Sequence, residues 1–438
     1  MNATGDGRDS ALFDFYGKPA PGQVIPLGLQ HVVAAIVGVV TPALLVSGAC
    51  GLSVAEQVVL VQASLLFTAL ATLIQLFPVM RIGAGLPVIM GTSFAFVPTL
   101  LAIGVRFDLP TILGAQIAGG LVAVVFGVFV KRLRVFFPPV VTGTVIISIG
   151  LSLYSTAVSY MAGGGAARAA GDFGSAKHWG AAMITLLVVI VCNNFTKGIT
   201  KMASILCGMV VGYIAALCMG LVDFTPVSQA SWFYLVSPLR FGLRFVPSAC
   251  ISLGIMFMVN AVQTIGDLTS TTLGGMDREP ETRELSGGII AQGLASMLGA
   301  LFGGLPTSSY SQNVGIVTVN RVVNRVVFAF AAGILLAAGF IPKFASVLAT
   351  IPQAVIGGAT ISVFAMITMT GVRMIAAEGL TSRTATVVGL ALALGVGVTS
   401  VADSLAGFPD WVGTVFGSSS VVIAAITAIL LNLVLPKE

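Results

Sequence analysis

The chain has 438 residues, of which 57% are hydrophobic and only 8% are charged, and its formal net charge is +5. Soluble domains carry about 25% charged residues, so this composition excludes a water-soluble globular protein and indicates a chain embedded in lipid. The Lys and Arg residues stand singly or in short groups between apolar runs, which argues against nucleic-acid binding through a basic stripe.

Residues 1–22 are polar and mixed in charge, so we interpret them as a tail without a signal peptide. A helix needs about 20 apolar residues to cross the hydrocarbon core. The sequence therefore predicts an all-α polytopic membrane protein with about fourteen segments. The predicted spans are 24–47, 57–78, 86–104, 109–130, 135–158, 179–194, 200–222, 247–273, 286–303, 306–322, 326–342, 350–371, 384–402 and 412–434.

The loops between these spans predict the orientation of the chain. An even number of spans puts both termini on one side. With that side facing the cytoplasm, the inner loops and tails hold 15 of the 21 Lys and Arg residues. Short basic loops stay in the cytoplasm, so we expect cytoplasmic termini. Residues 159–178 are small and polar and predict a flexible outer loop.

The two halves of the chain resemble each other. The fifth segment opens FPPVVTG (137–143) and the twelfth opens IPQAVIG (351–357), with Pro and Gly at matching places. Seven spans precede residue 223 and seven follow it, so the second half would enter the membrane upside down. Inverted repeats of this kind are typical of transporters, whose sites lie near the midplane between interrupted segments.

Two segments carry such interruptions. They are GTSFAFVP (91–98) in the third span and GGLPTSSYSQNVG (303–315) at the start of the tenth. Both are rich in residues that are poor in helix interiors. Irregular backbone at membrane depth is tolerated where protein or a cavity satisfies it, so we expect two short extended strands that meet beside a ligand. A pair of kinked packing helices is the alternative.

Asp267 is the one acidic residue predicted well inside a span. A carboxylate there costs about 2.5–3.5 kcal/mol on insertion scales, so it should face a cavity or a partner. Gln263, four residues earlier, shares its helical face, and Asn260 lies close to that face. The stripe predicts a pocket wall with a proton carrier or substrate-orienting acid. Polar contacts that only fix helix packing are the alternative.

Several further side chains could contact a ligand. Gln312 and Asn313 follow the second interruption, and a side-chain amide can pair with adjacent N–H and C=O groups such as the lactam edge of an oxidised purine. Phe94 and Tyr310 come from the two interruptions and could sandwich a flat ring, or lie in the hydrophobic core. His31, in the first span, could relay a proton, although a structural hydrogen bond is the more common role.

These residues together resemble the nucleobase–ascorbate transporter family, the second class of nucleobase:cation symporters. The resemblance covers nearly the whole chain. Its strongest part is the pattern QN-x-G-x(4)-T-x(3)-R, matched from Gln312 onward except that Asn320 and its neighbours vary. The stretches that carry it are LGLQHVV (27–33), LPVIMGTSFAFVP (86–98), FPPVVTG (137–143), TIGDLTSTT (264–272) and SQNVGIVTVNRVVNR (311–325).

The resemblance implies two inverted seven-segment repeats and a division into core and gate domains. After the cytoplasmic tail, the core would take 23–134 and 247–344, and the gate would take 135–246 and 345–438. Substrate would bind the core beside the crossed strands. Movement of core against gate would give alternating access. Dimers are usual in the family, so we expect a homodimer in the bacterial inner membrane.

The family's functional positions fall on named residues of this chain. The resemblance implies substrate binding by Phe94, Gln263, Gln312 and Asn313, and proton coupling or orientation by Asp267 and His31. Beside these we expect Tyr310 and Ser311 to contact the substrate, with support from Thr92, Ser93 and Gln292. A Gln at 312 favours purines, where uracil carriers have Glu. We therefore expect import of xanthine or uric acid coupled to protons, with sodium as the alternative ion.

Two positions depart from the family pattern. The binding glutamate of the eighth segment is Gln263 here, and the aspartate of the ninth segment is Gln292. Neither amide can carry a proton, so coupling would rest on Asp267, with or without His31. An uncoupled facilitator, or a carrier of uracil, guanine, hypoxanthine or ascorbate, stays open. Two histidines and five cysteines without a CxxC spacing predict no metal, cofactor or enzymatic activity.

Overall fold

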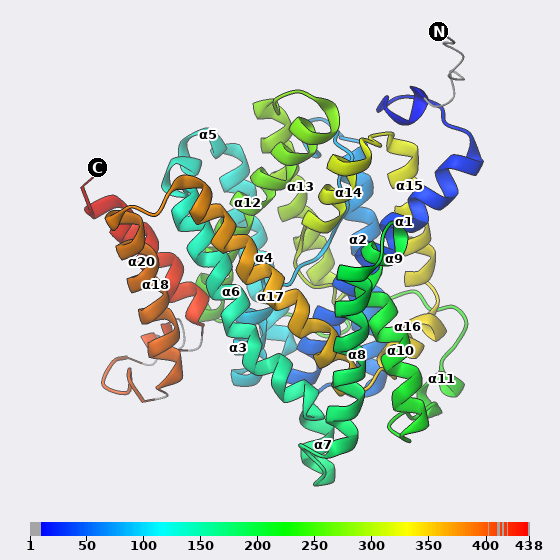
Figure 1. The fold of residues 1–438 in the computed structure, drawn as a ribbon. Helices are drawn as coiled ribbons and strands as arrows, with labels where there is room; N and C mark the ends of the chain where they lie inside the picture. Colours follow the sequence, from blue (N-terminus) through cyan, green and yellow to red (C-terminus); the bar gives the residue numbers. More distant parts are fainter. Residues whose placement is uncertain (1–9, 402, 410–411, 414–415, 418, 437–438) are drawn as a thin grey trace.

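The computed structural model describes residues 10–401, 403–409, 412–413, 416–417 and 419–436, and the chain is mainly helical there (Figure 1). Eight of the described helices are long and apolar enough to cross a membrane, and the bent pair α15–α16 would make a ninth. Three shorter apolar helices add to these. The helical membrane fold predicted from the composition is therefore confirmed, while the number fourteen stays a prediction.

The helices form two groups by their contacts. The core group consists of α1 (Pro21–Ala49), α2 (Val54–Leu76), β1 (Met90–Thr92), α3 (Val97–Arg106), α4 (Leu109–Val128), α12 (Pro247–Met276), α13 (Thr282–Leu301), β2 (Thr307–Ser309), α14 (Ser311–Asn320), α15 (Arg325–Gly339) and α16 (Pro342–Ala349). The gate group consists of α6 (Pro139–Met161), α7 (Gly164–Ala170), α8 (Ala176–Phe195), α9 (Ile199–Met202), α10 (Ser204–Cys218), α17 (Gln353–Glu378), α18 (Ser382–Ser400) and α20 (Ser420–Val434).

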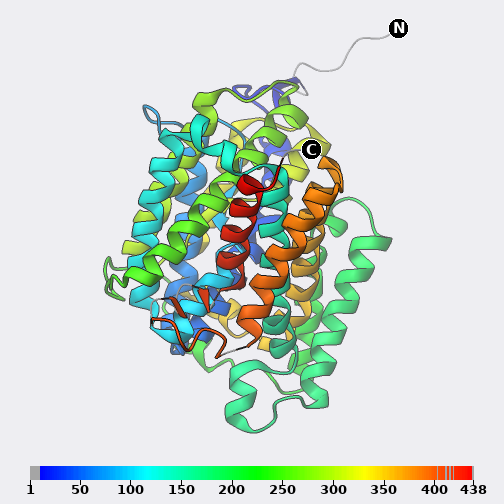
Figure 2. The ribbon, with the colours of Figure 1, turned by 90° about the vertical axis from the view of Figure 1, so that its left-hand side faces the viewer.

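Short elements connect or flank these groups. They are η1 (Ser10–Leu12), α5 (Val130–Leu133), η2 (Arg134–Phe136) and α11 (Thr225–Gln229). Figure 2 shows α18 and α20 side by side at the edge of the gate group. The start of α1 and the end of α20 lie at the same end of the molecule (Figures 1 and 2). The boundaries predicted for the core and gate domains stay predictions.

A glycine seam joins α6 to α17, the two most extensively packed helices of the gate group. A Cβ added to Gly143 would lie 2.9 Å from the carbonyl oxygen of Gly371. A Cβ added to Gly357 would lie 2.8 Å from the carbonyl oxygen of Ala157. Gly357 follows Gly143 in the sequence by as many residues as Gly371 follows Ala157. The two contacts are therefore equivalent, with the roles of α6 and α17 exchanged. This exchange is what an inverted repeat produces.

The two predicted interruptions meet as strands. β1 and β2 pair antiparallel, with Met90 opposite Ser309, Gly91 opposite Ser308 and Thr92 opposite Thr307. All six residues are buried. The pairing satisfies backbone groups that would otherwise be unpaired at membrane depth. Each strand leads within a few residues into the N-terminus of a half-length helix, α3 or α14.

Two details of the sequence interpretation need correction. The outer stretch 159–178, predicted as a flexible loop, contains the end of α6, all of α7 and the start of α8. His178 is buried there, with Nε2 2.8 Å from Asp172 Oδ1. The predicted last span, 412–434, includes residues that lie outside the described ones, and its described helix is α20.

Candidate substrate and proton site

Asp267 lies on α12, facing strand β2 and the first turn of α14. Its Oδ2 accepts a hydrogen bond from Ser309 Oγ at 2.5 Å, and its Oδ1 accepts one from Ser311 Oγ at 2.7 Å. Asp267 is buried, with 8% of the residue exposed, and its carboxylate has no ion-pair partner among the described residues. Two hydroxyl donors therefore stabilise its charged form where a cation would otherwise be needed.

A chain of buried polar groups continues from this pair along α12 and α13. Ser309 Oγ lies 3.4 Å from Thr264 Oγ1, which donates to Gln292 Oε1 at 2.7 Å. Gln292 Nε2 donates in turn to Asn260 Oδ1. All of these side chains are buried. Gln292, which takes the place of an acid in the family pattern, thus connects α13 to the polar face of α12.

Gln312 stands at the accessible edge of this polar region. Ser311 and Gln312 are exposed, and Gln263 is half-buried. Ser311 bonds Asp267 directly, and Gln263 is one helical turn from Asp267 along α12. Gln263 thus neighbours Asp267 along α12, and Gln312 follows the Asp267 partner Ser311 at the start of α14.

Asn313 and His31 form a separate contact between α14 and α1. Asn313 Nδ2 lies 3.0 Å from His31 Nδ1 and donates to the His31 carbonyl oxygen at 3.1 Å. The His31 ring also packs on Phe328, with centroids 4.4 Å apart. Both residues are buried. The contact joins α1 to α14 next to Gln312, and the role predicted for His31 stays a prediction.

The two candidate aromatic residues point in different directions. The Phe94 ring meets Phe364 of the gate helix α17 edge-on, with centroids 5.5 Å apart. Tyr310 is buried, donates its hydroxyl to the Thr92 carbonyl oxygen at 2.6 Å, and lies beside Gly38 and Gly91. Phe94 thus lies where core and gate groups touch, while Tyr310 connects the two strands.

Thr92 and Ser93 complete the turn that leads toward α3. The Thr92 hydroxyl is buried without a hydrogen-bond partner in the described part of the chain. Ser93 accepts a bond from the Ala95 amide at 3.2 Å, and its own amide donates to the Pro306 carbonyl oxygen at 3.3 Å. Both residues support the strand crossing rather than contacting Asp267.

Sequence reasoning missed Ser309 and Thr264. Ser309 stands two residues before Ser311, so period-two alternation through β2 puts both on the side of α12. Thr264 lies three residues before Asp267, a spacing that shares a helical face. Both signals were present in the sequence, but hydroxyl residues are common in membrane helices and carry little weight alone.

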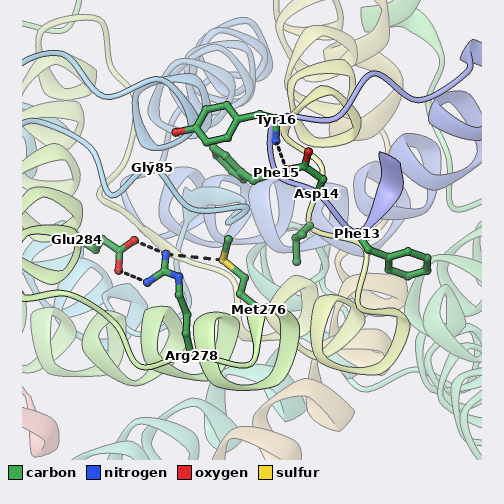
Figure 3. A pocket seen from close by; sticks show the side chains of 9 residues that line it. Phe13, Asp14, Phe15, Tyr16, Gly85, Met276, Arg278 and Glu284 are labelled. Carbon is green, nitrogen blue, oxygen red and sulfur yellow. Dashed lines mark hydrogen bonds and ion pairs between the residues drawn. The ribbon is translucent and has the colours of Figure 1, made fainter. Parts of the chain in front are cut away.

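A cavity of about 400 Å³ lies elsewhere, at the end of the molecule where α1 begins (Figure 3). Tyr16 and Phe15 line one side, and Arg278 bonded to Glu284 lines the other. Arg278 donates from Nη1 and Nη2 to the two carboxylate oxygens of Glu284, at 2.9 and 2.5 Å. None of the predicted site residues lines this cavity.

Comparison with known proteins decides the family. A permease family model, Xan_ur_permease, matches residues 22–404. The chain is 34% identical over 421 residues to the xanthine permease of Bacillus subtilis (strain 168), covering 94% of each chain. It is 35% identical to the uric acid permease PucK of the same organism, covering 94% of this chain and 95% of PucK. The chain belongs to the nucleobase–ascorbate transporter family.

Membership in the nucleobase–ascorbate transporter family makes this chain a membrane transporter and not an enzyme. Its fold also resembles the transmembrane domain of the cyanobacterial bicarbonate transporter BicA, with a TM-score of 0.59, 16% identity and coverage of 93% of this chain and 98% of that one. At that identity the likeness concerns the fold alone. It agrees with the arrangement of a core group around crossed strands and a separate gate group.

Proposed function

We propose that this transporter imports a purine base, xanthine or uric acid, together with a proton. The observation that carries the proposal is the placement of an exposed amide, Gln312, directly beside Ser311, whose hydroxyl bonds the buried carboxylate of Asp267. Relatives at 34% and 35% identity are a xanthine permease and a uric acid permease. The same few side chains would then serve base recognition and proton coupling.

An amide at position 312 suits an oxidised purine. Its oxygen accepts from a ring N–H while its nitrogen donates to the neighbouring C=O. A carboxylate could supply only acceptors. Gln263, half-buried one turn from Asp267, offers a second amide to the base. The N-terminus of α14 has no side-chain cap, so backbone N–H groups of its first turn are available to the same ligand.

Asp267 is the residue we assign to proton coupling. It is the one carboxyl group in the described part of α12, α14 and β2. Its two oxygens accept from Ser309 and Ser311, so a proton that binds there must be accommodated by these two hydroxyl groups. His31 would act through Asn313 as an orienting residue.

Transport would proceed by alternating access, with the core group moving against the gate group. Such a motion would break two contacts between the groups. One is the edge-on contact of Phe94 with Phe364, and the other joins Thr99 Oγ1 to Ser419 Oγ at 3.3 Å. We place the protein in the bacterial inner membrane as a homodimer with cytoplasmic termini. No cofactor is assigned.

The first test is uptake of radiolabelled xanthine and uric acid by transporter-deficient bacteria, with and without a protonophore. We expect accumulation of at least one base that the protonophore abolishes. Absence of uptake for both bases would refute the substrate assignment.

An uncoupled facilitator is the second candidate, favoured by Gln263 and Gln292 standing where the family pattern has acids. Both are amides that carry no proton. In that case labelled base would equilibrate across the membrane without accumulating, and the protonophore would leave uptake unchanged.

A further inference from the structure

We infer that Ser309 and Thr264 form a hydrogen-bond switch that senses whether Asp267 carries a proton, an inference that rests on the proposed proton coupling. Ser309 is the residue whose hydroxyl changes orientation in this switch. It lies on β2 and contacts two acceptors, the Asp267 carboxylate at 2.5 Å and the Thr264 hydroxyl oxygen at 3.4 Å. A serine hydroxyl has one proton to donate, so it can serve one of these acceptors at a time.

Gln292 fixes the donor-to-acceptor direction of this series of hydrogen bonds. Its Nε2 donates to Asn260, so its Oε1 is the atom that faces Thr264. The Thr264 hydroxyl donates its one proton to that oxygen at 2.7 Å, so it can only accept a hydrogen bond from Ser309. An aspartate at position 292 would also accept from Thr264, but it would add a second charge to a buried region.

The two protonation states of Asp267 therefore call for two orientations of the Ser309 hydroxyl. When Asp267 is ionised, Ser309 donates to its Oδ2. When Asp267 gains a proton on that oxygen, the acid donates to Ser309 Oγ, and the Ser309 proton turns to Thr264. No proton is created or lost beyond the one bound, and every hydroxyl keeps one donated bond. Thr264 thus stabilises the protonated state, and Ser309 stabilises the ionised one.

Few other charges reach this switch. The elements packed on α12 include α3, α4, α6, α13, α14, α20 and β2. Their charged residues in the described ranges stand only at helix ends: Arg106 closes α3, and Arg283 with Glu284 opens α13. Their other titratable groups, with those of α12 itself, are Tyr154, Tyr160 and Cys250. His31 contacts α14 through Asn313.

Infrared difference spectroscopy tests the switch on the purified full-length protein. The carboxyl stretch that disappears in Asp267→Asn is titrated with pH in each variant. We expect the midpoint to rise by about one pH unit in Ser309→Ala, which loses a donor to the charged acid, and to fall by about half a unit in Thr264→Val. Ser309→Thr keeps the hydroxyl and should stay near the wild-type midpoint.

Thr271→Val is the matched control. Thr271 is buried on the same helix, but its hydroxyl donates to the backbone carbonyl oxygen of Asp267 and not to the carboxylate. Its midpoint should match wild type. A Thr264→Val midpoint that also matches wild type would overturn the switch, and so would a rise, which would mean that Thr264 donates toward Ser309. A spectrum without a titrating band that depends on Asp267 would overturn it as well.

Uptake measured on the same variants separates this inference from the proposed function. If a protonophore leaves wild-type uptake unchanged, proton coupling is rejected. The role of the switch in transport is then rejected too, whatever the spectra show. Protonophore-sensitive uptake combined with unmoved midpoints would reject the switch alone.

Discussion

The β1–α3 segment and the β2–α14 segment have the same construction, a three-residue strand followed by a ten-residue helix. They differ in what the helix start presents. α3 begins Val97–Pro98, both buried, and Pro98 has no N–H to offer. α14 begins Ser311–Gln312, both exposed, with a full set of backbone donors. The strand-and-helix arrangement therefore occurs twice, but only the helix start of α14 exposes polar side chains.

This asymmetry suggests a division of labour between the two segments. Changes at the exposed start of α14, or at Asp267, which Ser311 bonds, should abolish or redirect transport while leaving the protein folded. Changes at the buried strand crossing, where Gly91 meets Tyr310, should act mainly on packing. Four substitutions, ordered from the largest expected effect to the smallest, test that difference.

Asp267→Asn should have the largest effect. The amide cannot ionise, so accumulation of the base should fall to simple equilibration while the amount of protein in the membrane stays normal. The measurement is the steady-state ratio of internal to external labelled base. Asp277→Asn makes the same chemical change at the exposed end of α12, where Asp277 pairs with Arg321, and should leave the ratio intact. Full accumulation by Asp267→Asn would remove Asp267 from coupling.

Gln312→Glu should weaken purine uptake next most strongly. The carboxylate cannot donate to the base and brings a charge beside the Ser311–Asp267 contact. We expect KM for xanthine to rise about tenfold or more, which corresponds to about 1.4 kcal/mol. Gln229→Glu, at an exposed position in α11, is the control. An unchanged KM would take Gln312 out of the binding site.

Gly91→Ala probes the other segment. The new Cβ would lie 2.8 Å from the Tyr310 hydroxyl oxygen and 2.9 Å from Thr68 Oγ1, so buried neighbours must move. Overpacking of this kind costs about 1–3 kcal/mol, and the melting temperature of the purified protein should fall. Gly389→Ala in α18 meets nothing within 4 Å and should not lower it. Equal melting temperatures for the two variants would show that the strand crossing is not tightly packed.

Tyr310→Phe should have the smallest effect. It removes the hydroxyl that bonds the Thr92 carbonyl oxygen but keeps the ring between Gly38 and Gly91. The loss of one hydrogen bond costs about 1 kcal/mol, seen as a slightly lower melting temperature with KM changed less than about threefold. A large rise in KM would mean that Tyr310 contacts the base directly and that the site extends across both segments.

Much of this framework was predictable from the sequence. Hydrophobic runs located most helices, because lipid demands long apolar stretches, and clusters of Gly, Ser, Thr and Pro located both strands. Asp267 stood out because a carboxylate in a span is rare. The α7 helix within 159–178 was missed, because small residues such as the alanines of Gly164–Ala170 fit a short helix as well as a loop.

The partners of the predicted residues could not be derived from the sequence. Gln292 and Thr264 lie on different helices, and only helix packing shows that they bond. The opposite directions of Phe94 and Tyr310 likewise depend on how β1 pairs with β2. Sequence spacing describes one helix face or one strand at a time, while a transporter site forms between several elements.

The most direct test of the account uses purified protein reconstituted into liposomes with an imposed pH gradient, alkaline inside. With wild type, we predict that labelled xanthine or uric acid accumulates above its external concentration, that the accumulation collapses when the gradient is dissipated, and that Asp267→Asn liposomes only equilibrate the base. Accumulation that survives loss of the gradient, or that persists in Asp267→Asn, would contradict proton coupling through Asp267.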